Sequence, residues 1–325
     1  ELDSQIISLQ PKVMFPDMGK FSPLNTKANL LFLLQYYKYH YTYDVILKEA
    51  SISSSIPTPE TDNKLNSHIA DIQSCCAKHK LSTQAVKMYL WALIDRNSVN
   101  PLLDMISSKP WDGTDRLGVL IGTITTNDDP KYVKAVITKW LIQCIAAWDR
   151  AENSPVPNVL PRFENILTFV GKQGINKTKF FELLFPSDYN KYIVAGQHLD
   201  VTNKDSLKLA ISAGITELGE VDSTLKNDPA MLKAFLSKPV DKFRRPYAVV
   251  ESEFPRRVSF CATVNDHEFL VDPTGNRRFH PLWVLFIDFK TYLKIDKQQL
   301  WAQINETLYL KGHHWWIDEE NDPEV

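Results

Sequence analysis

The 325-residue sequence carries almost no net charge and has no long apolar run. Lys and Arg total 37 against 39 Asp and Glu, which leaves a formal charge of -2 at pH 7. Because a basic surplus is the electrostatic signature of nucleic-acid binding, any contact with DNA must come from a local patch. No apolar run approaches the roughly 18 residues of a membrane span, and the first residues, ELDSQIISLQ, lack a signal-peptide pattern. We therefore expect no membrane contact.

Cysteine is scarce as well, and several kinds of catalytic site are missing. The cysteines are Cys75, Cys76, Cys144 and Cys261, with no Cys-x-x-Cys pair. This pattern gives no disulfide framework, so we expect a reducing compartment and a cytoplasmic location. No Ser-His-Asp triad, glycosidase acid pair or nuclease carboxylate cluster stands out, and the pair His313 and His314 lacks further ligands at metal-site spacing. The chain does not begin with Met, so we expect a piece of a longer protein.

The first half of the chain has the apolar spacing of amphipathic helices. With 44% hydrophobic and 23% charged residues, the composition is globular and the length suits about two domains. Helices are predicted over 27–50, 62–80, 83–98 and 130–149. We assign 1–152 to an α-helical N-terminal region, because NSPVPNVLPRF, from 153 on, reads as a proline-rich connector.

The period of the apolar residues changes after this connector. Buried strands are predicted over 165–170, 213–218, 258–264 and 279–286, with helices over 176–185 and 228–237. Alternating strands and helices indicate an α/β fold with a parallel sheet. We assign 153–290 to this core and 291–325 to a small C-terminal helical segment.

A glycine-containing loop joins the first of these strands to the first of these helices. GKQGINKT, residues 171–178, fits the phosphate-loop pattern G-x-x-x-x-G-K-[ST] except at Asn176. Gly171, Gln173, Gly174 and Asn176 would surround phosphates with backbone N–H groups, while Lys177 would reach the β and γ phosphates and Thr178 the Mg²⁺. Asn tolerates a left-handed backbone better than most residues, so it is a mild replacement for Gly. The alternative is a loop that merely resembles the motif.

Polar residues follow the later strands in an order that suits an ATPase. Glu217 and Glu220 end one apolar run and are candidates for holding Mg²⁺ and polarising water. Asn265 ends the next run and is a candidate for orienting that water. Arg277 and Arg278 open the following strand and are candidates for an arginine finger that reaches a neighbouring subunit. Each alone is more often a surface or turn residue, but in this order and at this spacing they support each other.

A basic segment before the third strand is the candidate DNA contact. SKPVDKFRRPYAVVESEFPRR, residues 237–257, has two probable short strands around Pro246 and six cations. We single out Lys242, Arg244, Arg245 and Tyr247, because cations contact phosphates and an aromatic ring stacks on a base. A solvated loop or an intersubunit ion-pair patch is the alternative.

From about Asn29 to its end, the chain resembles the virulence-associated E (VapE) family of phage and mobile-element proteins. The family core is similar to superfamily 3 helicases and D5-type AAA+ ATPases. The motifs that carry the resemblance are WDGTDRL (111–117), FVGKQGINKTKF (169–180), ITELGE (215–220), LKAFLSKPVDKFRRPYA (232–248), PRRVSFCATVND (255–266), FLVDPTGNRRFHPLWV (269–284) and LWAQINETLYLKGHHWW (300–316).

The resemblance implies an ATP-dependent helicase or translocase that acts on single-stranded or forked DNA. It also implies a homo-oligomeric ring, hexameric by analogy, often coupled to an upstream primase domain or other replication proteins. The roles implied are ATP and Mg²⁺ binding for Lys177 and Thr178, Walker B acids for Glu217 and Glu220, sensor 1 for Asn265, and the finger for Arg277 or Arg278. The family usually has Gly where this chain has Asn176, a departure that leaves open a weakly hydrolysing, ATP-binding scaffold or regulatory module.

Overall fold

A computed structural model describes residues 14–55, 62–219, 229–244, 250–265 and 276–317. They form two compact units. The smaller unit contains most of the described residues up to Val99, and the larger unit contains Val45–Lys48 and most of those from Asn100 on.

The smaller unit combines helices with a sheet in which β1 lies in the middle. Its helices are α2 (Lys27–Tyr36), α3 (Lys64–Lys78) and α4 (Val86–Asp95), and its strands are β1 (Tyr39–Asp44), β2 (Glu49–Ser54) and β3 (Ser98–Val99). β1 pairs with β2 in the antiparallel sense and with β3 in the parallel sense. The predicted helices over 62–80 and 83–98 are confirmed as α3 and α4.

The helix predicted over 27–50 is wrong beyond Tyr36. The chain leaves α2 through Lys38, whose φ is 54°, and enters the hairpin of β1 and β2. The buried residues of β1, Tyr39 and Tyr43, are four apart and so also match a helix period. The aromatic and β-branched run YHYTYD nevertheless favours a strand. The region predicted as α-helical over 1–152 therefore contains strands as well as helices.

The larger unit is built on a six-stranded sheet with the order β4-β11-β5-β10-β7-β6. Its strands are β4 (Ile124–Thr126), β5 (Ile166–Val170), β6 (Ile193–Gln197), β7 (Ile215–Gly219), β10 (Ser259–Val264) and β11 (Phe279–Ile287). All neighbouring pairs are parallel except β4 with β11. The predicted α/β class with a parallel sheet is confirmed, and β5, β7, β10 and β11 lie where strands were expected. β6 and β4 were not predicted.

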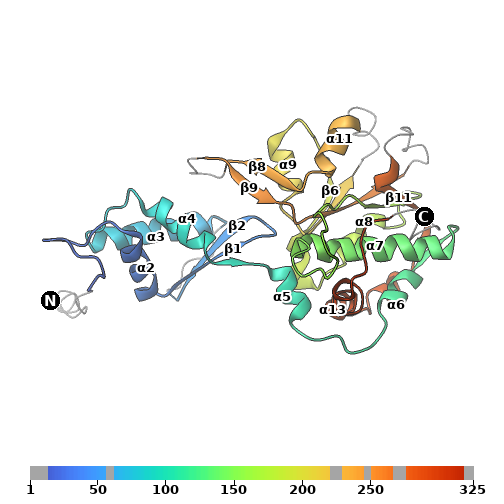
Figure 1. The fold of residues 1–325 in the computed structure, drawn as a ribbon, viewed down its shortest axis with the longest axis horizontal. Coiled ribbons are helices and arrows are strands. Elements are labelled where there is room, and N and C mark those ends of the chain that lie inside the picture. Colours follow the sequence, from blue (N-terminus) through green and yellow to red (C-terminus); the bar gives the residue numbers. More distant parts are fainter. Residues whose placement is uncertain (1–13, 56–61, 220–228, 245–249, 266–275, 318–325) are drawn as a thin grey trace. The chain divides into compact units, whose positions relative to one another are not determined.

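Helices cover both faces of this sheet (Figure 1). They are α5 (Pro101–Ser107), α6 (Leu117–Gly122), α7 (Pro130–Asp149), α8 (Lys177–Glu182), α9 (Lys204–Ala210), α11 (Pro229–Leu236), α12 (Phe289–Tyr292) and α13 (Lys297–Thr307). One core cluster joins α7, α8 and α13 to one face, and another joins α9 and α11 to the other. The predicted helix over 130–149 is confirmed as α7, where Asp129 accepts a hydrogen bond from the Lys131 amide and Pro130 occupies the first turn.

The C-terminal helix α13 is part of the main core of the larger unit. Trp301 on α13 is fully buried, packs its ring 4.7 Å from that of Trp148 on α7, and donates to the Leu184 carbonyl. These contacts cross both predicted domain boundaries, at 152 and 290, although the three-part division stays a prediction. No helix in the described ranges is long and apolar enough to cross a membrane.

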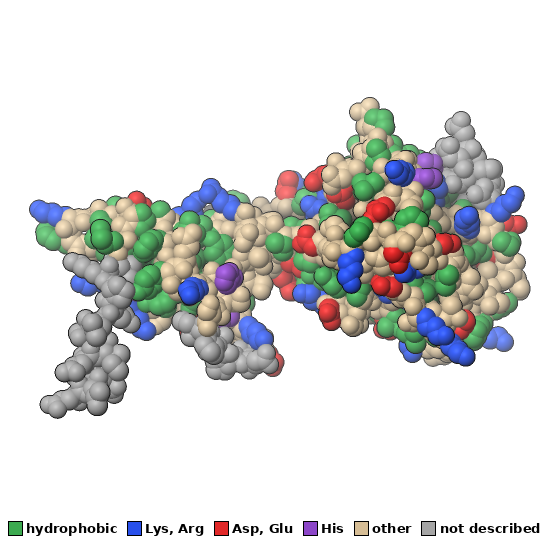
Figure 2. Space-filling view, turned by 90° about the horizontal axis from the view of Figure 1, so that it is seen from below, with side chains coloured by type: hydrophobic (Ala, Val, Ile, Leu, Met, Phe, Trp, Pro, Cys, Tyr) green, Lys and Arg blue, Asp and Glu red, His purple; other side chains and the backbone are tan. Residues whose placement is uncertain are grey.

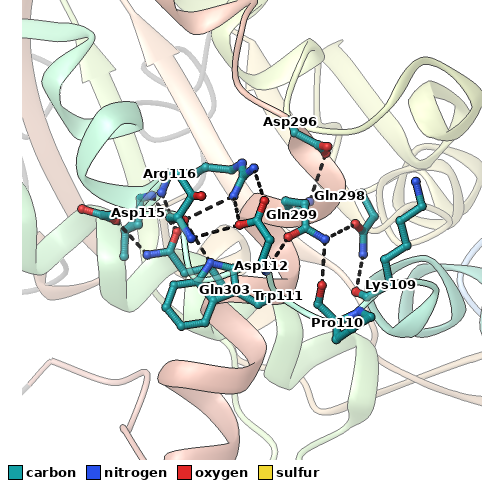
Figure 3. A network of polar contacts seen from close by, with 12 residues as sticks. Lys109, Pro110, Trp111, Asp112, Asp115, Arg116, Asp296, Gln298, Gln299 and Gln303 are labelled. Carbon is teal, nitrogen blue, oxygen red and sulfur yellow. Dashed lines mark hydrogen bonds and ion pairs between the residues drawn. The ribbon is translucent and has the colours of Figure 1, made fainter.

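The WDGTDRL motif is fastened to α13 by glutamine side chains (Figure 3). Gln299 accepts from the Asp112 amide and donates to the Pro110 carbonyl, at 2.8 and 2.9 Å. Gln303 accepts from the amides of Arg116 and Leu117. Arg116 in turn forms an ion pair with Asp112 at 2.7 Å, which lowers the pKa of that carboxyl. The motif therefore has a structural role in joining the segment before α6 to the C-terminal helix.

Candidate functional site

The glycine-containing loop lies at the carboxyl edge of the parallel sheet. It leaves β5, whose five residues are all buried, and enters α8 at Lys177. The Gly171 amide donates to the Val264 carbonyl at the end of β10, at 3.2 Å. Ligands of open α/β sheets bind at this edge, where neighbouring strands diverge to their connections.

Asn176 has a left-handed backbone, with φ 61° and ψ 39°. The sequence expectation that Asn at this position tolerates such a conformation is confirmed. Gly174 has φ 90°. At Gly171 a Cβ atom would overlap the Val284 carbonyl oxygen, so this position requires glycine for close approach of the backbone. The loop is thus tightly turned, with positive φ at Gly174 and Asn176 and with Gly171 packed against the β11 backbone.

The Lys177 ammonium is turned inward among oxygen atoms. Its Nζ donates to the carbonyls of Gly171 and Lys172, at 2.6 and 3.0 Å, and to Asn265 Oδ1 at 2.9 Å. The residue is only 6% exposed, and its burial lowers the pKa of the ammonium, partly offset by Glu217. The structure therefore brings together two predicted site residues that are 88 positions apart.

Glu217 is fully buried on β7 and is held by two donors. One carboxylate oxygen accepts from the Gly196 amide and the other from the Thr263 hydroxyl, both at 2.5 Å. Thr263 Oγ1 also lies 3.3 Å from Thr178 Oγ1. A chain of polar contacts therefore links the start of α8, through β10, to the acid on β7.

Thr263 and Gly196 are the residues that the sequence did not reveal. In the register of β10 with β7, Cys261 pairs with Glu217, so these two side chains point to the same face of the sheet. Thr263 lies two residues beyond Cys261 and therefore points to that face as well. That signal becomes readable only once the two strands are known to be neighbours. Gly196 lies in β6, beside a register shift that brings its amide to the carboxylate.

Arg277 and Arg278 lie at the opposite edge of the sheet. They precede β11, whose Phe279 pairs with Ile166 at the start of β5. The five residues of β5 therefore separate them from Gly171 by roughly 17 Å. Arg278 forms an ion pair with Glu164 at 2.9 Å and donates to Ser237 Oγ at 2.8 Å. The structure does not bring either arginine to the loop of its own chain.

Arg277 is exposed and lines a cavity of about 310 Å³ at this amino edge. Arg162, Trp315 and Trp316 also line it. Trp315 is buried, with its ring 5.9 Å from that of Phe163. In the described part of the chain, no three His, Cys, Asp or Glu gather as metal ligands.

The basic segment forms the predicted hairpin. β8 (Val240–Phe243) pairs with β9 (Ser252–Pro255) in the antiparallel sense. Lys242 forms an exposed ion pair with Glu253 across the hairpin, at 2.7 Å. Arg244 is exposed. Arg245 and Tyr247, like Glu220, lie outside the described residues.

Two of the six cations counted toward a DNA patch belong to the interior instead. Arg256 is 1% exposed, forms an ion pair with Asp241 at 2.8 Å, and lies 4.4 Å from the centre of the Phe235 ring. Arg257 donates to the Trp148 carbonyl at 2.6 Å. On the face of the larger unit that Figure 2 shows, away from the hairpin, Lys and Arg are dispersed among Asp and Glu. The six-cation estimate was therefore too high.

The profile of the Virulence-associated protein E-like domain matches residues 106–325, more than half of the chain. The chain belongs to this family. No curated protein matches the chain.

Among solved structures, an apo structure of the NrS-1 C-terminal region superposes with a TM-score of 0.51 at 14% identity, over 85% of this chain and 68% of that one. Another apo form of that region gives a TM-score of 0.49, also at 14% identity, over 90% and 69%. The first likeness extends the shared fold beyond the matched family domain, and at this identity it concerns the fold alone.

Proposed function

We propose that this VapE-like chain is a P-loop ATPase with an AAA+-like core, and that it drives a helicase or translocase on DNA. The observation that carries the proposal is the convergence of four side chains, Lys177, Thr178, Glu217 and Asn265, at one edge of a parallel sheet. They come from one loop and helix and two further strands, and each has the chemistry that ATP hydrolysis requires.

The loop and its lysine are suited to the phosphates of ATP. The backbone from Lys172 to Asn176 offers N–H donors to the phosphates, and the close packing of Gly171 against the Val284 carbonyl holds the loop against β11. Lys177 Nζ is held by two carbonyl oxygens and one amide oxygen, none of them charged. A phosphate anion is a stronger partner than these, so we infer that Lys177 turns to the β and γ phosphates when ATP binds.

Thr178 and Glu217 fit a magnesium ion that accompanies ATP, since hydroxyl and carboxylate oxygens are its preferred ligands. Bound there, Mg²⁺ would neutralise charge that develops on the transferred phosphoryl group. The Glu217 carboxylate, which Thr263 and Gly196 hold in place, would also orient the attacking water. Asn265, directly after β10, accepts from the Lys177 ammonium and would act at the γ phosphate.

Arg277 and Arg278 point to hydrolysis between subunits. Because they lie at the far edge of the sheet from the loop, they would act only at the site of another copy. Arg277 is the exposed one of the two, whereas Arg278 pairs with Glu164. A guanidinium supplied in this way stabilises the transition state. We therefore propose a ring of identical subunits, hexameric by analogy with the AAA+ ATPases that the sequence resembles.

The hairpin is the proposed contact with single-stranded or forked DNA. Arg244 is exposed next to its tip, and the sequence adds Arg245 and Tyr247. With Lys242, these residues offer charge to phosphates and a ring to bases. The family assignment supports a role in the replication of a phage or mobile element, together with a primase domain or other replication proteins, in the cytoplasm.

The decisive measurement is DNA-stimulated ATP hydrolysis by the purified protein, with Lys177→Ala as the blank. We expect hydrolysis in the wild type and a loss of about 100-fold or more in the variant, because the variant removes the charge that faces the phosphates. Lys204→Ala, an exposed lysine at the start of α9, is the matched control. Undiminished hydrolysis in Lys177→Ala would refute the site.

A second candidate is an ATP-binding module of replication that hydrolyses little. Asn176 favours it, because the family pattern usually has Gly there. ATP binding that depends on Lys177, without hydrolysis in the presence of DNA, would support this module over the helicase.

A further inference from the structure

A cavity of about 220 Å³ adjoins the glycine-containing loop, and Lys177 is not among the residues that line it. Its walls come from the end of β5, the loop and the end of β11. They consist of Val170, Gly171, Lys172, Ile175, Trp283, Val284 and Leu285. Apart from the Lys172 ammonium and the Trp283 indole N–H, the lining side chains are apolar. This volume is below the roughly 300–1,000 Å³ of pockets that hold a whole drug-sized ligand, so the cavity suits one ring system.

The cavity and the polar groups lie on different strands, and this arrangement indicates how a bound nucleotide would be oriented. In the sheet β5 lies between β10 and β11. Lys177, Thr178 and Glu217 make their contacts toward β10 and β7. A nucleotide whose phosphates meet these groups extends its uncharged end the other way, toward the end of β11, which is where the cavity lies.

A break in the β4–β11 ladder shapes this end of the sheet. The register shifts between Val284 and Phe286, so Leu285 is the extra residue of a bulge. Bulges re-aim side chains and are common beside active sites. Leu285 remains 52% exposed although it lines the cavity. Covering this exposed apolar side chain with a ring removes apolar surface from water, which favours binding.

We propose that this cavity receives the base of the nucleotide and that Leu285 and Ile175 hold the ring by apolar contact. The inference rests on the proposed nucleotide site at Lys177. It assigns the two ends of the ligand to different strands, the phosphates to β10 and β7 and the base to β11. Binding of the base is then separable from binding of the phosphates.

The test compares two ligands, MgATP and magnesium tripolyphosphate, which share the phosphate chain but differ in the base and sugar. Leu285→Trp fills the cavity and Leu285→Gln makes its mouth polar without adding charge. We expect both variants to lose about tenfold or more in ATP affinity by calorimetry. We expect their tripolyphosphate affinity to stay within about twofold of wild type. Leu293→Gln, at an exposed leucine that does not line the cavity, is the control for both ligands.

The outcomes separate this proposal from the nucleotide site itself. If the Leu285 variants bind ATP like the wild type, or lose ATP and tripolyphosphate equally, the base pocket is wrong. If Lys177→Ala keeps its affinity for both ligands, the phosphate site is wrong and the base assignment falls with it. Thermal unfolding midpoints of all variants identify any that fail to fold, and for these the smaller change Leu285→Ala replaces the original variant.

Discussion

The glycine-containing loop and the basic hairpin were both recognised from short stretches of sequence, yet the structure treats them differently. In the loop site, Lys177 donates to Asn265, and the Thr263 hydroxyl donates to Glu217 and faces Thr178. In the hairpin, Arg256 and Arg257 turn to the protein interior and Lys242 pairs with Glu253. Polar residues at the ends of buried strands lie close together as predicted, because the strands fix their positions. A count of cations in a segment does not reveal which of them already pair with other residues of the protein.

The sharpest test of this difference concerns the buried arginine at the base of the hairpin. Arg256→Met leaves the Asp241 carboxylate without its partner, so we expect a loss of about 3–5 kcal/mol in the free energy of unfolding. Lys242→Met breaks the exposed pair with Glu253 and should leave the free energy of unfolding nearly unchanged, because solvent screens such a pair. Urea denaturation of both variants measures the two losses. Equal losses would mean that Arg256 is not structural.

The next test concerns Thr263 as a positioning residue in the loop site. Thr263→Val keeps the shape but removes the hydroxyl that holds Glu217 and faces Thr178. We expect turnover of ATP to fall about 100-fold, a loss typical of an oriented catalytic group, while the affinity for ATP changes less than about threefold.

Two matched variants control for the loss of a buried hydroxyl at Thr263. Thr263→Ser keeps the donor and should restore most of the turnover. Thr216→Val removes a buried hydroxyl that faces the Ala210 carbonyl instead, and should lower stability with turnover intact. If Thr263→Val turned over ATP normally, Glu217 would not need this contact.

The smallest expected effect lies at the exposed part of the hairpin. Charge reversal at Arg244 and Arg245 should lower the affinity for single-stranded DNA by about tenfold and reduce the salt dependence of binding by about one phosphate contact per residue. Hydrolysis of ATP without DNA should survive. Fluorescence anisotropy over a series of salt concentrations measures both quantities, with Lys204→Glu as the control. Unchanged DNA binding would reject the hairpin as the contact.

The central sheet could be predicted from the sequence because its strands are short apolar runs bounded by turns. The geometry of Asn176 could also be foreseen, since few residues other than Gly accept a positive φ. β1 could not, because Tyr39 and Tyr43 are spaced as they would be on a helix face. Thr263 and Gly196 remained hidden for another reason. Their contacts with Glu217 depend on which strands are neighbours in the sheet, and the order of the strands cannot be predicted from a single sequence.

The placement of Arg277 and Arg278 at the far edge of the sheet has a consequence for kinetics. Under the proposed mechanism, a chain with the glycine-containing loop on one edge and the arginines on the other carries two halves of different sites. ATP turnover per subunit should then rise with total protein concentration until assembly is complete. An arginine-deficient subunit mixed with a lysine-deficient one then restores hydrolysis that neither possesses alone.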